Sequence, residues 1–432
     1  MRIFISGIGG TAMAPLTEIA TDANIDVCGS DPKHSPQTDE LERRGVKVYY
    51  EQSEENIAQV FAKTPFDWLV YSSAIPEDSP ELKFARDHHI HYSKRDEFLA
   101  KFIDDKHLDL IAIAGTHGKT TTTSMLVWVF HELHRPVSYS IGSTISFGPA
   151  GHFAKDARFF VYEADEYDRN FLAYQPVIST VVSLDYDHAD IYPTIENYRD
   201  AFREFISNSQ KTILWRSTAN QLFPNGDQDN SLTILDDNIS RKLVDLPGQK
   251  VRENAELVVE ILRESLDGFD EDQIREILSR FPGADRRFEK IRENLISDYA
   301  HTPTEIKATL QKAREIADLR NQKIIAIYQP HQNARQIEIL RENGYGDTFE
   351  DADEIYWLPT YLNRLDLLPG AAKVVTPGEL VQSLGRDSQP VAHVVEFGND
   401  LAQLIRGKLR DPNNLIVALG AGPIDGWVRE NI

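Results

Sequence analysis

Cysteine and long apolar runs are nearly absent from this sequence. Cys28 is the only cysteine among its 432 residues, which excludes an intramolecular disulfide and a metal cluster built on cysteines. No run approaches the roughly 18 consecutive apolar residues that a membrane-spanning helix needs, and the apolar stretch after Met1 is too short for a signal peptide. These absences predict a cytoplasmic protein in a reducing compartment.

Positive charge is also scarce. The chain has 46 Lys and Arg residues against 68 Asp and Glu residues, which gives a formal net charge of -22 at pH 7. Nonspecific binding to nucleic acids or anionic membranes requires a basic surface, so we expect neither as a partner. A nucleotide is still compatible, since backbone dipoles, Mg2+ and a few cations can hold phosphates locally. We expect small-molecule substrates, and the sequence does not determine the oligomeric state.

A short glycine loop predicts a phosphate-binding site. Between a strand-like run at residues 108–114 and a helical pattern at residues 125–133 lies the sequence Gly115-Thr116-His117-Gly118-Lys119-Thr120-Thr121. In such a loop the backbone N–H groups and the helix N-terminus hold a polyphosphate, the lysine contacts the terminal phosphates, and the hydroxyl that follows reaches Mg2+. Ile113 stands where a standard P-loop has its first glycine. A plain turn between strand and helix is the alternative.

A second glycine loop lies near the N-terminus. Residues 3–6 read as a strand, and Gly7-Ile8-Gly9-Gly10-Thr11-Ala12 leads from it into a helical pattern. Ser30 and Asp31 follow the next apolar run, at the distance where a Rossmann unit places an acidic residue against a ribose or base. Ser72 and Ser73 follow a further strand at residues 68–71. These strand ends predict a nucleotide-like ligand, although the glycine loop alone could be a tight turn.

Short apolar runs alternate with helical patterns, which predicts parallel sheets covered by helices. A chain of 432 residues fits about three domains. We expect an α/β protein with a Rossmann-like N-terminal domain at residues 1–106, a central P-loop domain with a mixed or parallel sheet and helices at residues 107–287, and a Rossmann-like C-terminal domain at residues 288–432. The strands expected in the last domain are residues 295–299, 323–328, 354–358, 393–397 and 415–419.

Acidic residues and a histidine follow two strands of the central region. The run 163–168 begins with Glu163 after a strand at residues 159–162, and the run 187–190 contains His188 after a strand at residues 177–184. Neighbouring parallel strands end at the same edge, so both side chains are expected near the P-loop. One carboxylate and one imidazole could hold a second hard cation during phosphoryl transfer. The alternative is a solvated acidic turn with His188 as a helix cap.

Further polar groups lie at the start of the third region. Arg286 and Arg287 follow a turn and could deliver a guanidinium to phosphate oxygens. Two later strand ends carry the remaining candidates, which are Asp298, Tyr299, His301, His331 and Arg335. Any one of them alone could equally be structural.

In this order the motifs resemble those of the Mur ligase family of peptidoglycan synthesis over essentially the whole chain. Residues 115–120 match the family's ATP loop, and Glu163 and His188 match its metal ligands. Residues 283–289 match its arginine turn and residues 298–301 its third-domain signature. The first-domain loops and residues 419–422 look most like the branch that adds L-alanine.

The resemblance implies roles for individual residues. The catalytic residues would be Lys119, Glu163, His188 and Arg287, and the Mg2+ ligands Thr120, Glu163 and His188. The ATP-binding residues would be Gly115, Thr116, His117, Gly118, Lys119, Thr120, Thr121, Asn254, Arg287 and Asp298. The UDP-sugar-binding residues would be Gly9, Gly10, Thr11, Ala12, Ser30, Asp31, Ser72 and Ser73. The amino-acid-binding residues would be Tyr299, His301 and Arg335.

Three departures from the family pattern affect this transfer. Only Gly248 and Asn254 remain of the family's adenine-side pattern, so the adenine contacts are the least secure. Phe202 stands where some branches carry a carbamylated lysine, and the absence of that lysine is typical of the alanine-adding and tripeptide-adding branches. Gln332 stands where the alanine-adding branch has the first of two arginines, which leaves Arg335.

The activity implied is an ATP-dependent, ADP-forming ligation of UDP-N-acetylmuramate to L-alanine. ATP and Mg2+ would be the cofactors, and the three domains would bind UDP-sugar, ATP and amino acid in chain order. One alternative is the recycling ligase that attaches a ready-made tripeptide to the same nucleotide sugar. A more distant alternative is a P-loop nucleotide switch, which would hydrolyse nucleotide without an acceptor amine.

Overall fold

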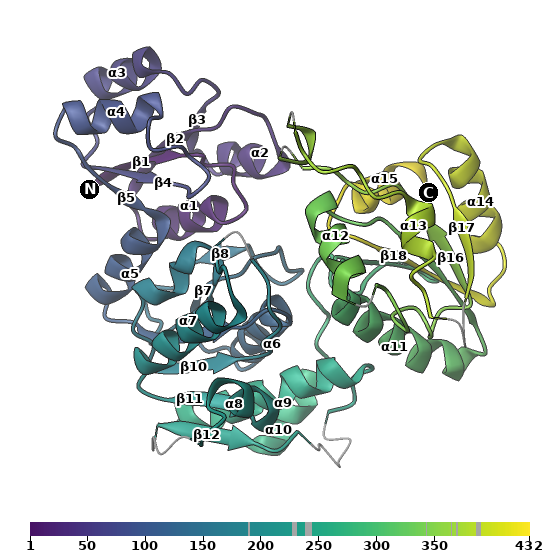
Figure 1. Ribbon diagram of the computed structural model, residues 1–432. Helices are drawn as coiled ribbons and strands as arrows, with labels where there is room; N and C mark the ends of the chain where they lie inside the picture. The colour runs from purple at the N-terminus through teal and green to yellow at the C-terminus, as the bar shows by residue number, and fades with distance from the viewer. Residues whose placement is uncertain are drawn as a thin grey trace. The chain divides into compact units, whose positions relative to one another are not determined.

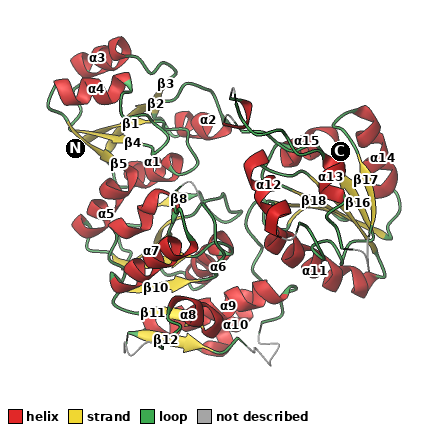
Figure 2. Ribbon diagram, in the orientation of Figure 1, coloured by secondary structure: helices red, strands yellow, loops and turns green. Residues whose placement is uncertain are grey.

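The structure is a computed structural model that describes residues 1–188, 191–226, 231–237, 244–342, 344–363, 365–368, 370–385 and 390–432. Ala189 and Asp190, in one of the acidic runs discussed above, lie outside these ranges. The chain forms two compact units, Met1–Val244 with Asn254–Pro282, and Asp245–Glu253 with Gly283–Ile432. Figure 1 follows the chain from its N-terminus to its C-terminus, and Figure 2 shows strands and helices alternating along it. Within the described ranges, no helix has both the length and the apolar character needed to cross a bilayer.

The first sheet is parallel throughout and has the order β3-β2-β1-β4-β5. Its strands are β1 (Arg2–Ser6), β2 (Asp26–Ser30), β3 (Lys47–Tyr49), β4 (Trp68–Tyr71) and β5 (His91–Lys94), and its helices are α1 (Met13–Asp22), α2 (Pro36–Arg43), α3 (Glu54–Lys63), α4 (Pro80–Asp87) and α5 (Arg95–Asp105). The strand order reverses between β1 and β4. In open α/β sheets that point, beyond the carboxyl ends of the strands, is where ligands bind.

The second sheet carries the P-loop and has the order β12-β11-β10-β6-β9-β7-β8. Its strands are β6 (Asp109–Ala114), β7 (Ser138–Ser140), β8 (Gly151–His152), β9 (Phe159–Glu163), β10 (Ile178–Val181), β11 (Thr212–Trp215) and β12 (Leu232–Leu235). Its helices are α6 (Lys119–Glu132), the 3-10 helix η1 (Tyr167–Ala173), α7 (Ile195–Ser207), α8 (Arg216–Leu222), α9 (Gln249–Ser265) and α10 (Glu271–Ser279). Only the pair β7 and β8 is antiparallel among the described strand pairs.

One apolar cluster runs continuously from the first sheet into the second. It joins Ile5 of β1 and Phe98 of α5 to Phe160 of β9 and Phe202 of α7. On the opposite face of the first sheet, Phe4 and Cys28 pack with α3 and α4 in a separate cluster. The first two sheets therefore share a hydrophobic core, which explains why they belong to one compact unit.

The third sheet has the order β13-β14-β18-β15-β16-β17, with only β13 and β14 antiparallel among the described pairs. Its strands are β13 (Glu289–Arg292), β14 (Leu295–Asp298), β15 (Lys323–Tyr328), β16 (Glu354–Trp357), β17 (Val391–Val394) and β18 (Asn414–Leu419). Its helices are α11 (Pro303–Arg320), α12 (Asn333–Glu342), the 3-10 helix η2 (Leu365–Leu367), α13 (Pro377–Val381), α14 (Asn399–Leu409) and α15 (Ile424–Asn431).

Strand β15 shows why an unbroken apolar run forms the middle of this sheet. Ile324, Ala326 and Tyr328 pack into one buried cluster, while Ile325 and Ile327 pack into the cluster on the opposite face. Successive side chains of a strand point to opposite faces, so a strand covered on both sides must be apolar at every position.

The predicted α/β class with three sheet-forming regions is confirmed. Two expected strands differ from those observed by more than one residue at an end. The strand expected at residues 177–184 is shorter, Ile178–Val181, because the residues after it turn to hold the P-loop. The strand expected at residues 393–397 is Val391–Val394, because it pairs with β16 in a register that begins at Val391 and Glu354. The domain boundaries at 106/107 and 287/288 stay predictions.

Candidate active site

The glycine loop predicted to bind phosphate joins β6 to α6. Gly115 and Gly118 have φ values of 128° and 85°, which strain any residue with a side chain. A Cβ atom at Gly115 would lie 2.8 Å from the carbonyl oxygen of Ser183. Gly118 stands at the N-cap of α6. The loop therefore approaches its neighbours closely and presents a helix N-terminus, as an anion site requires.

The segment that follows β10 holds this loop in place. The Thr116 hydroxyl donates to the Asp185 carbonyl oxygen over 2.7 Å, and the His117 N–H donates to the Ser183 hydroxyl over 2.8 Å. Asp185 also lies beside His117, with 3.3 Å between Oδ2 and Nε2. Thr116 and His117 thus fix the loop, and Thr121 is half-buried in the first turn of α6.

Lys119 is bound by a carboxylate that the sequence did not single out. Its ammonium donates to Glu166 Oε2 over 2.8 Å and to Oε1 over 3.1 Å, and also to the carbonyl oxygen of Gly115. Burial disfavours the charge of Lys119, but Glu166 and the nearby Asp165 outweigh it and raise the pKa of the lysine. The alternative of a solvated acidic turn fails at Glu166, which is buried.

Glu163 lies at the carboxyl end of β9 and contacts the hydroxyl predicted to bind Mg2+. Thr120 Oγ1 donates to Glu163 Oε1 over 2.8 Å, and the Gly142 N–H donates to Glu163 Oε2 over 2.7 Å. Carboxylate and hydroxyl oxygens are the ligands that hard cations prefer. The chemistry of Thr120 and Glu163 therefore fits Mg2+.

His188 lies near the same edge of the sheet but is oriented toward Glu166. Its Nε2 is 3.7 Å from Glu166 Oε1. Its carbonyl oxygen accepts hydrogen bonds from the N–H groups of Ile191 and Tyr192, as in a turn. In the described residues, Glu163, Glu166 and His188 do not form a group with all ligand atoms within 4.8 Å. An ion shared by Glu163 and His188 would therefore need substrate oxygens to complete its shell.

The glycine loop of the first sheet is shaped by Asp31. The Gly9 N–H donates to Asp31 Oδ2 over 3.0 Å. A Cβ atom at Gly9 would lie 2.6 Å from Thr38 Cγ2 and 3.0 Å from the Asp31 carboxylate, so the position requires glycine. Gly10 is half-buried, whereas Thr11 and Ala12 are exposed at the start of α1. These residues remain accessible to a ligand at the strand-order reversal.

Ser30 occupies a different position from the other first-sheet candidates. It is fully buried, and its carbonyl oxygen accepts hydrogen bonds from the N–H groups of Gly7 and Ile8. Burial also characterises Glu81, which accepts a hydrogen bond from the Ser6 hydroxyl. Burial raises the pKa of Glu81. Ser30 thus holds the backbone of the glycine loop. Glu81 was missed by sequence reasoning because it lies on α4, far along the chain from the loop.

The serines after β4 lie beside the same loop. A Cβ atom at Gly7 would lie 3.4 Å from the Cβ atom of Ser72. Ser72 is half-buried and accepts a hydrogen bond from the Ala74 N–H, while Ser73 is exposed. The structure therefore brings Ser72 to the first glycine loop and leaves Ser73 open to solvent.

Asn254 is buried in α9 against the P-loop. A Cβ atom at Gly118 would lie 3.2 Å from Asn254 Oδ1. Asn254 is thus next to the predicted phosphate site. Gly248 belongs to the other compact unit, where its N–H donates to Glu315 Oε2 over 2.9 Å.

The two arginines of the turn before β13 have different surroundings. The Arg286 guanidinium donates to the carbonyl oxygens of Gly420 and Gly422. In the part of the chain that the structure describes, Arg287 has neither a hydrogen bond nor an ion pair from its side chain; its guanidinium lies 4.9 Å from the centre of the Tyr299 ring. Arg287 is therefore the arginine that can still bind an anion.

Asp298 is the last residue of β14, and His301 follows three residues later. Asp298 is buried, and its carboxylate accepts from the N–H groups of Ala300 and Phe288 over 2.7 Å each. Burial raises its pKa. Burial alone would lower the pKa of His301, but the Glu305 carboxylate, 3.2 Å from Nδ1, raises it above its ordinary value.

The remaining amino-acid candidates surround the end of β15. His331 lies 5.6 Å from His301 between ring centres and stacks on Tyr361. Burial and the neighbouring His301 lower the pKa of His331 to about 4. Arg335, in the first turn of α12, is 3.1 Å from Glu338. The third sheet thus gathers Tyr299, His301 and His331 at one edge, with the Arg335 charge shared with a glutamate.

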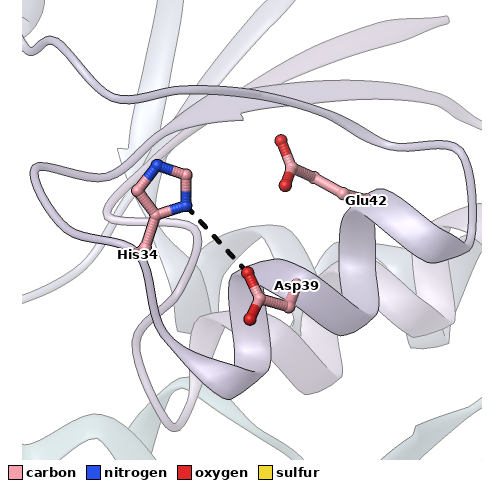
Figure 3. Close-up of side chains that lie close together, drawn as sticks. All are labelled: His34, Asp39 and Glu42. Carbon is pink, nitrogen blue, oxygen red and sulfur yellow. Dashed lines mark ion pairs between the residues drawn. The ribbon is translucent and has the colours of Figure 1, made fainter.

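A separate group of possible metal ligands lies on the surface at the start of α2. His34, Asp39 and Glu42 are exposed, and their ligand atoms lie within 4.8 Å of one another (Figure 3). His34 stacks on Tyr50 with 3.5 Å between ring centres. This stacking and the exposure of the carboxylates account for the arrangement without an ion.

Comparison with known proteins extends over almost the whole chain. Residues 2–107 match the catalytic domain model of the Mur ligase family, residues 113–231 its middle domain, and residues 286–422 its glutamate ligase domain. The chain is 31% identical over 463 residues to the UDP-N-acetylmuramate--L-alanine ligase of Jannaschia sp., covering 98% of this chain and 93% of that protein.

Solved structures show the same fold at lower sequence identity. A UDP-N-acetylmuramate-alanine ligase from Thermotoga maritima superimposes with a TM-score of 0.77 and 23% identity, covering 100% of this chain and 98% of that one. A murein peptide ligase from Psychrobacter arcticus has a TM-score of 0.66 at 23% identity, with the same coverage of 100% and 98%.

Proposed function

Because the chain belongs to the Mur ligase family, we propose that it is the ATP-dependent, ADP-forming ligase that joins UDP-N-acetylmuramate to L-alanine in peptidoglycan precursor synthesis. The observation that carries this proposal is the set of contacts around the P-loop. Lys119, Thr120 and Glu163 meet at one edge of the second sheet, in the same compact unit as the glycine loop of the first sheet.

The proposed reaction needs both substrates that the first and second sheets of that unit would bind. A carboxylate is a poor acylating group, so its oxygen first attacks the γ-phosphorus of ATP, which gives an acyl phosphate and ADP. The amine then attacks the acyl carbon, and phosphate leaves from the tetrahedral intermediate with the C–O electron pair. Binding both substrates in one site makes their reaction effectively intramolecular and lowers the entropic part of the barrier. Stabilisation of the charge on the transferring phosphoryl group accounts for most of the remaining catalysis.

The residues of this chain divide that work. Lys119 and the N-terminus of α6 at Gly118 would orient the phosphates, and Asn254 supports the loop. Mg2+, when held by Thr120 and Glu163 with His188 nearby, would neutralise phosphate charge. Arg287 and Asp298 would contact ATP from the other compact unit. In this scheme residues 1–106 bind the UDP-sugar, residues 107–287 bind ATP and residues 288–432 present the amino acid.

A second function, ligation of a tripeptide in place of L-alanine, is supported by the residues expected to bind the acceptor. An amino acid carboxylate requires a cation, and Gln332 leaves Arg335 as the arginine of that segment, already 3.1 Å from Glu338. A tripeptide acceptor, as in the recycling branch, would find its carboxylate contacts elsewhere. Substitution Gln332→Arg should lower the KM for L-alanine if the free amino acid is the acceptor.

A phosphate-release assay coupled to product detection tests the proposal. Purified protein with ATP, Mg2+ and UDP-N-acetylmuramate should release phosphate only when an acceptor amine is added, with L-alanine preferred over glycine and L-serine. Preference for an L-alanyl-γ-D-glutamyl-diamino-acid tripeptide would replace this function with the recycling ligase. Phosphate release that ignores both carboxylate and amine would indicate a nucleotide switch instead.

A further inference from the structure

The cation of the P-loop is already neutralised by the protein itself. Lys119 has a side chain 16% exposed and Glu166 one only 2% exposed. Both oxygens of Glu166 accept from the Lys119 ammonium, and the Gly115 carbonyl oxygen accepts as well. A nucleotide that needs Lys119 for its terminal phosphates must therefore take it away from Glu166.

That exchange leaves a buried charge to be compensated. Removing one partner from a buried ion pair is strongly unfavourable, since the other charge remains out of water without a counter-charge. The Tyr192 hydroxyl donates to the Glu166 carbonyl oxygen over 2.5 Å and fixes the backbone there, and the side chain of Glu166 is buried. A cation that takes the place of the lysine would compensate the charge of Glu166.

The surroundings of Glu166 suit a divalent cation as the replacement. His188 Nε2 lies 3.7 Å from Glu166 Oε1. Glu163, three residues earlier, directs its carboxylate to the hydroxyl of Thr120, the residue after Lys119. The two glutamates thus flank the start of α6, and the released carboxylate would face the phosphates that have just gained the lysine.

We propose that Glu166 is a positioning residue that holds Lys119 in the nucleotide-free protein and exchanges it for a divalent cation when a nucleotide binds. The exchange couples the two ligands: nucleotide frees the carboxylate for the cation, and cation frees the lysine for the nucleotide. This inference rests on the proposed function only in taking a nucleoside polyphosphate as the ligand.

The first experiment measures binding of a non-hydrolysable ATP analogue by calorimetry, with Mg2+ and with a chelator. In the wild-type protein Mg2+ should tighten binding by about tenfold or more, in the usual range of coupled ligands. In Glu166→Gln the analogue should bind more tightly than in wild type without the cation, and the Mg2+ effect should be several-fold smaller than in wild type, because only the cation bound by Thr120 and Glu163 remains. Asp168→Asn is the matched control, because that carboxylate pairs with Lys94 instead, and it should keep the wild-type Mg2+ effect.

An unchanged Mg2+ effect in Glu166→Gln, or an equal loss of affinity with and without Mg2+, would reduce Glu166 to a structural residue and overturn the exchange.

The second experiment does not depend on the folding of that variant. Without nucleotide, Lys119→Met should bind Mn2+ several-fold more tightly than wild type, as followed by electron paramagnetic resonance, because its carboxylate partner is released. Adding Glu166→Gln should remove the gain.

Mn2+ binding to Lys119→Met that is no tighter than to wild type would contradict the proposal. These measurements read binding alone, so they remain decisive if the phosphate-release assay assigns another acceptor or no acceptor at all.

Discussion

Neighbouring side chains in this protein differ sharply in what they are free to bind. Arg286 is held by the carbonyl oxygens of Gly420 and Gly422, whereas the Arg287 guanidinium lies against the ring of Tyr299 and makes no side-chain hydrogen bond among the described residues. Arg287→Ala should lower kcat/KM for ATP by roughly 10- to 100-fold, the effect of losing a charged hydrogen bond, with little change in melting temperature. Arg286→Ala should mainly lower the melting temperature. Initial rates and thermal unfolding separate the two, and the reverse pattern would exchange their roles.

His331 should make the protein sensitive to acid. Its pKa is lowered from 6.5 to about 4 in the folded protein, by burial first and by His301 second, with Asp366 opposing. Between these values the unfolded chain binds more protons than the folded one, so the free energy of unfolding falls as the pH is lowered from 6.5 to 4.

His331→Gln removes that titration. The fall in unfolding free energy over this pH range, measured by urea denaturation, should then be smaller by up to about 3 kcal/mol. A His331→Gln curve parallel to wild type would mean that the imidazole is as easily protonated in the folded protein as in water.

At the scale of single residues, sequence reasoning found Glu163 but not Glu166. Both belong to one acidic run at the end of β9, and residue type alone does not distinguish them. The difference is burial: Glu166 is 1% exposed and paired with Lys119, which depends on the packing of η1 and of Tyr192 against it. The same holds for Arg286, whose partners Gly420 and Gly422 follow a strand far along the chain.

Among the elements, the loop between β1 and α1 depends on a glycine for space. The missing side chain at Gly9 leaves room for Thr38 and Asp31. Gly9→Ala should displace this loop and raise the KM for UDP-N-acetylmuramate, while the affinity for the ATP analogue stays near wild type. Steady-state kinetics and calorimetry measure the two. Gly45→Ala is a suitable control, since no atom lies within 4 Å of its Cβ position, although its positive φ adds some strain.

The elements themselves were largely predictable where the pattern was strong. Strand β15 was predicted at its observed bounds, because five consecutive residues buried on alternating faces, 324–328, leave an unbroken apolar signal. The edge strand β17 was misplaced by two residues at its start, since three of its four residues are exposed and its register comes from pairing with β16. The hydrophobic pattern of a sequence reflects the burial of side chains, and an exposed edge strand such as β17 has few buried side chains.

For the whole molecule, the proposed ligand contacts fall on both compact units. ATP would touch Lys119 in one unit and Arg287 in the other. Binding should therefore favour a closed arrangement. Small-angle X-ray scattering should give a smaller radius of gyration with ATP analogue and UDP-N-acetylmuramate than without ligands. Protein that binds both and keeps its radius would speak against closure.

The apolar cluster shared by the first and second sheets implies that the two glycine loops melt together. A ligand that binds only the native state stabilises every part that unfolds with its site. In differential scanning calorimetry, UDP-N-acetylmuramate alone should therefore raise the temperature at which the ATP loop unfolds. The two loops are therefore expected to unfold in one cooperative transition. Saturating the protein with either substrate should raise the unfolding temperature of both binding sites.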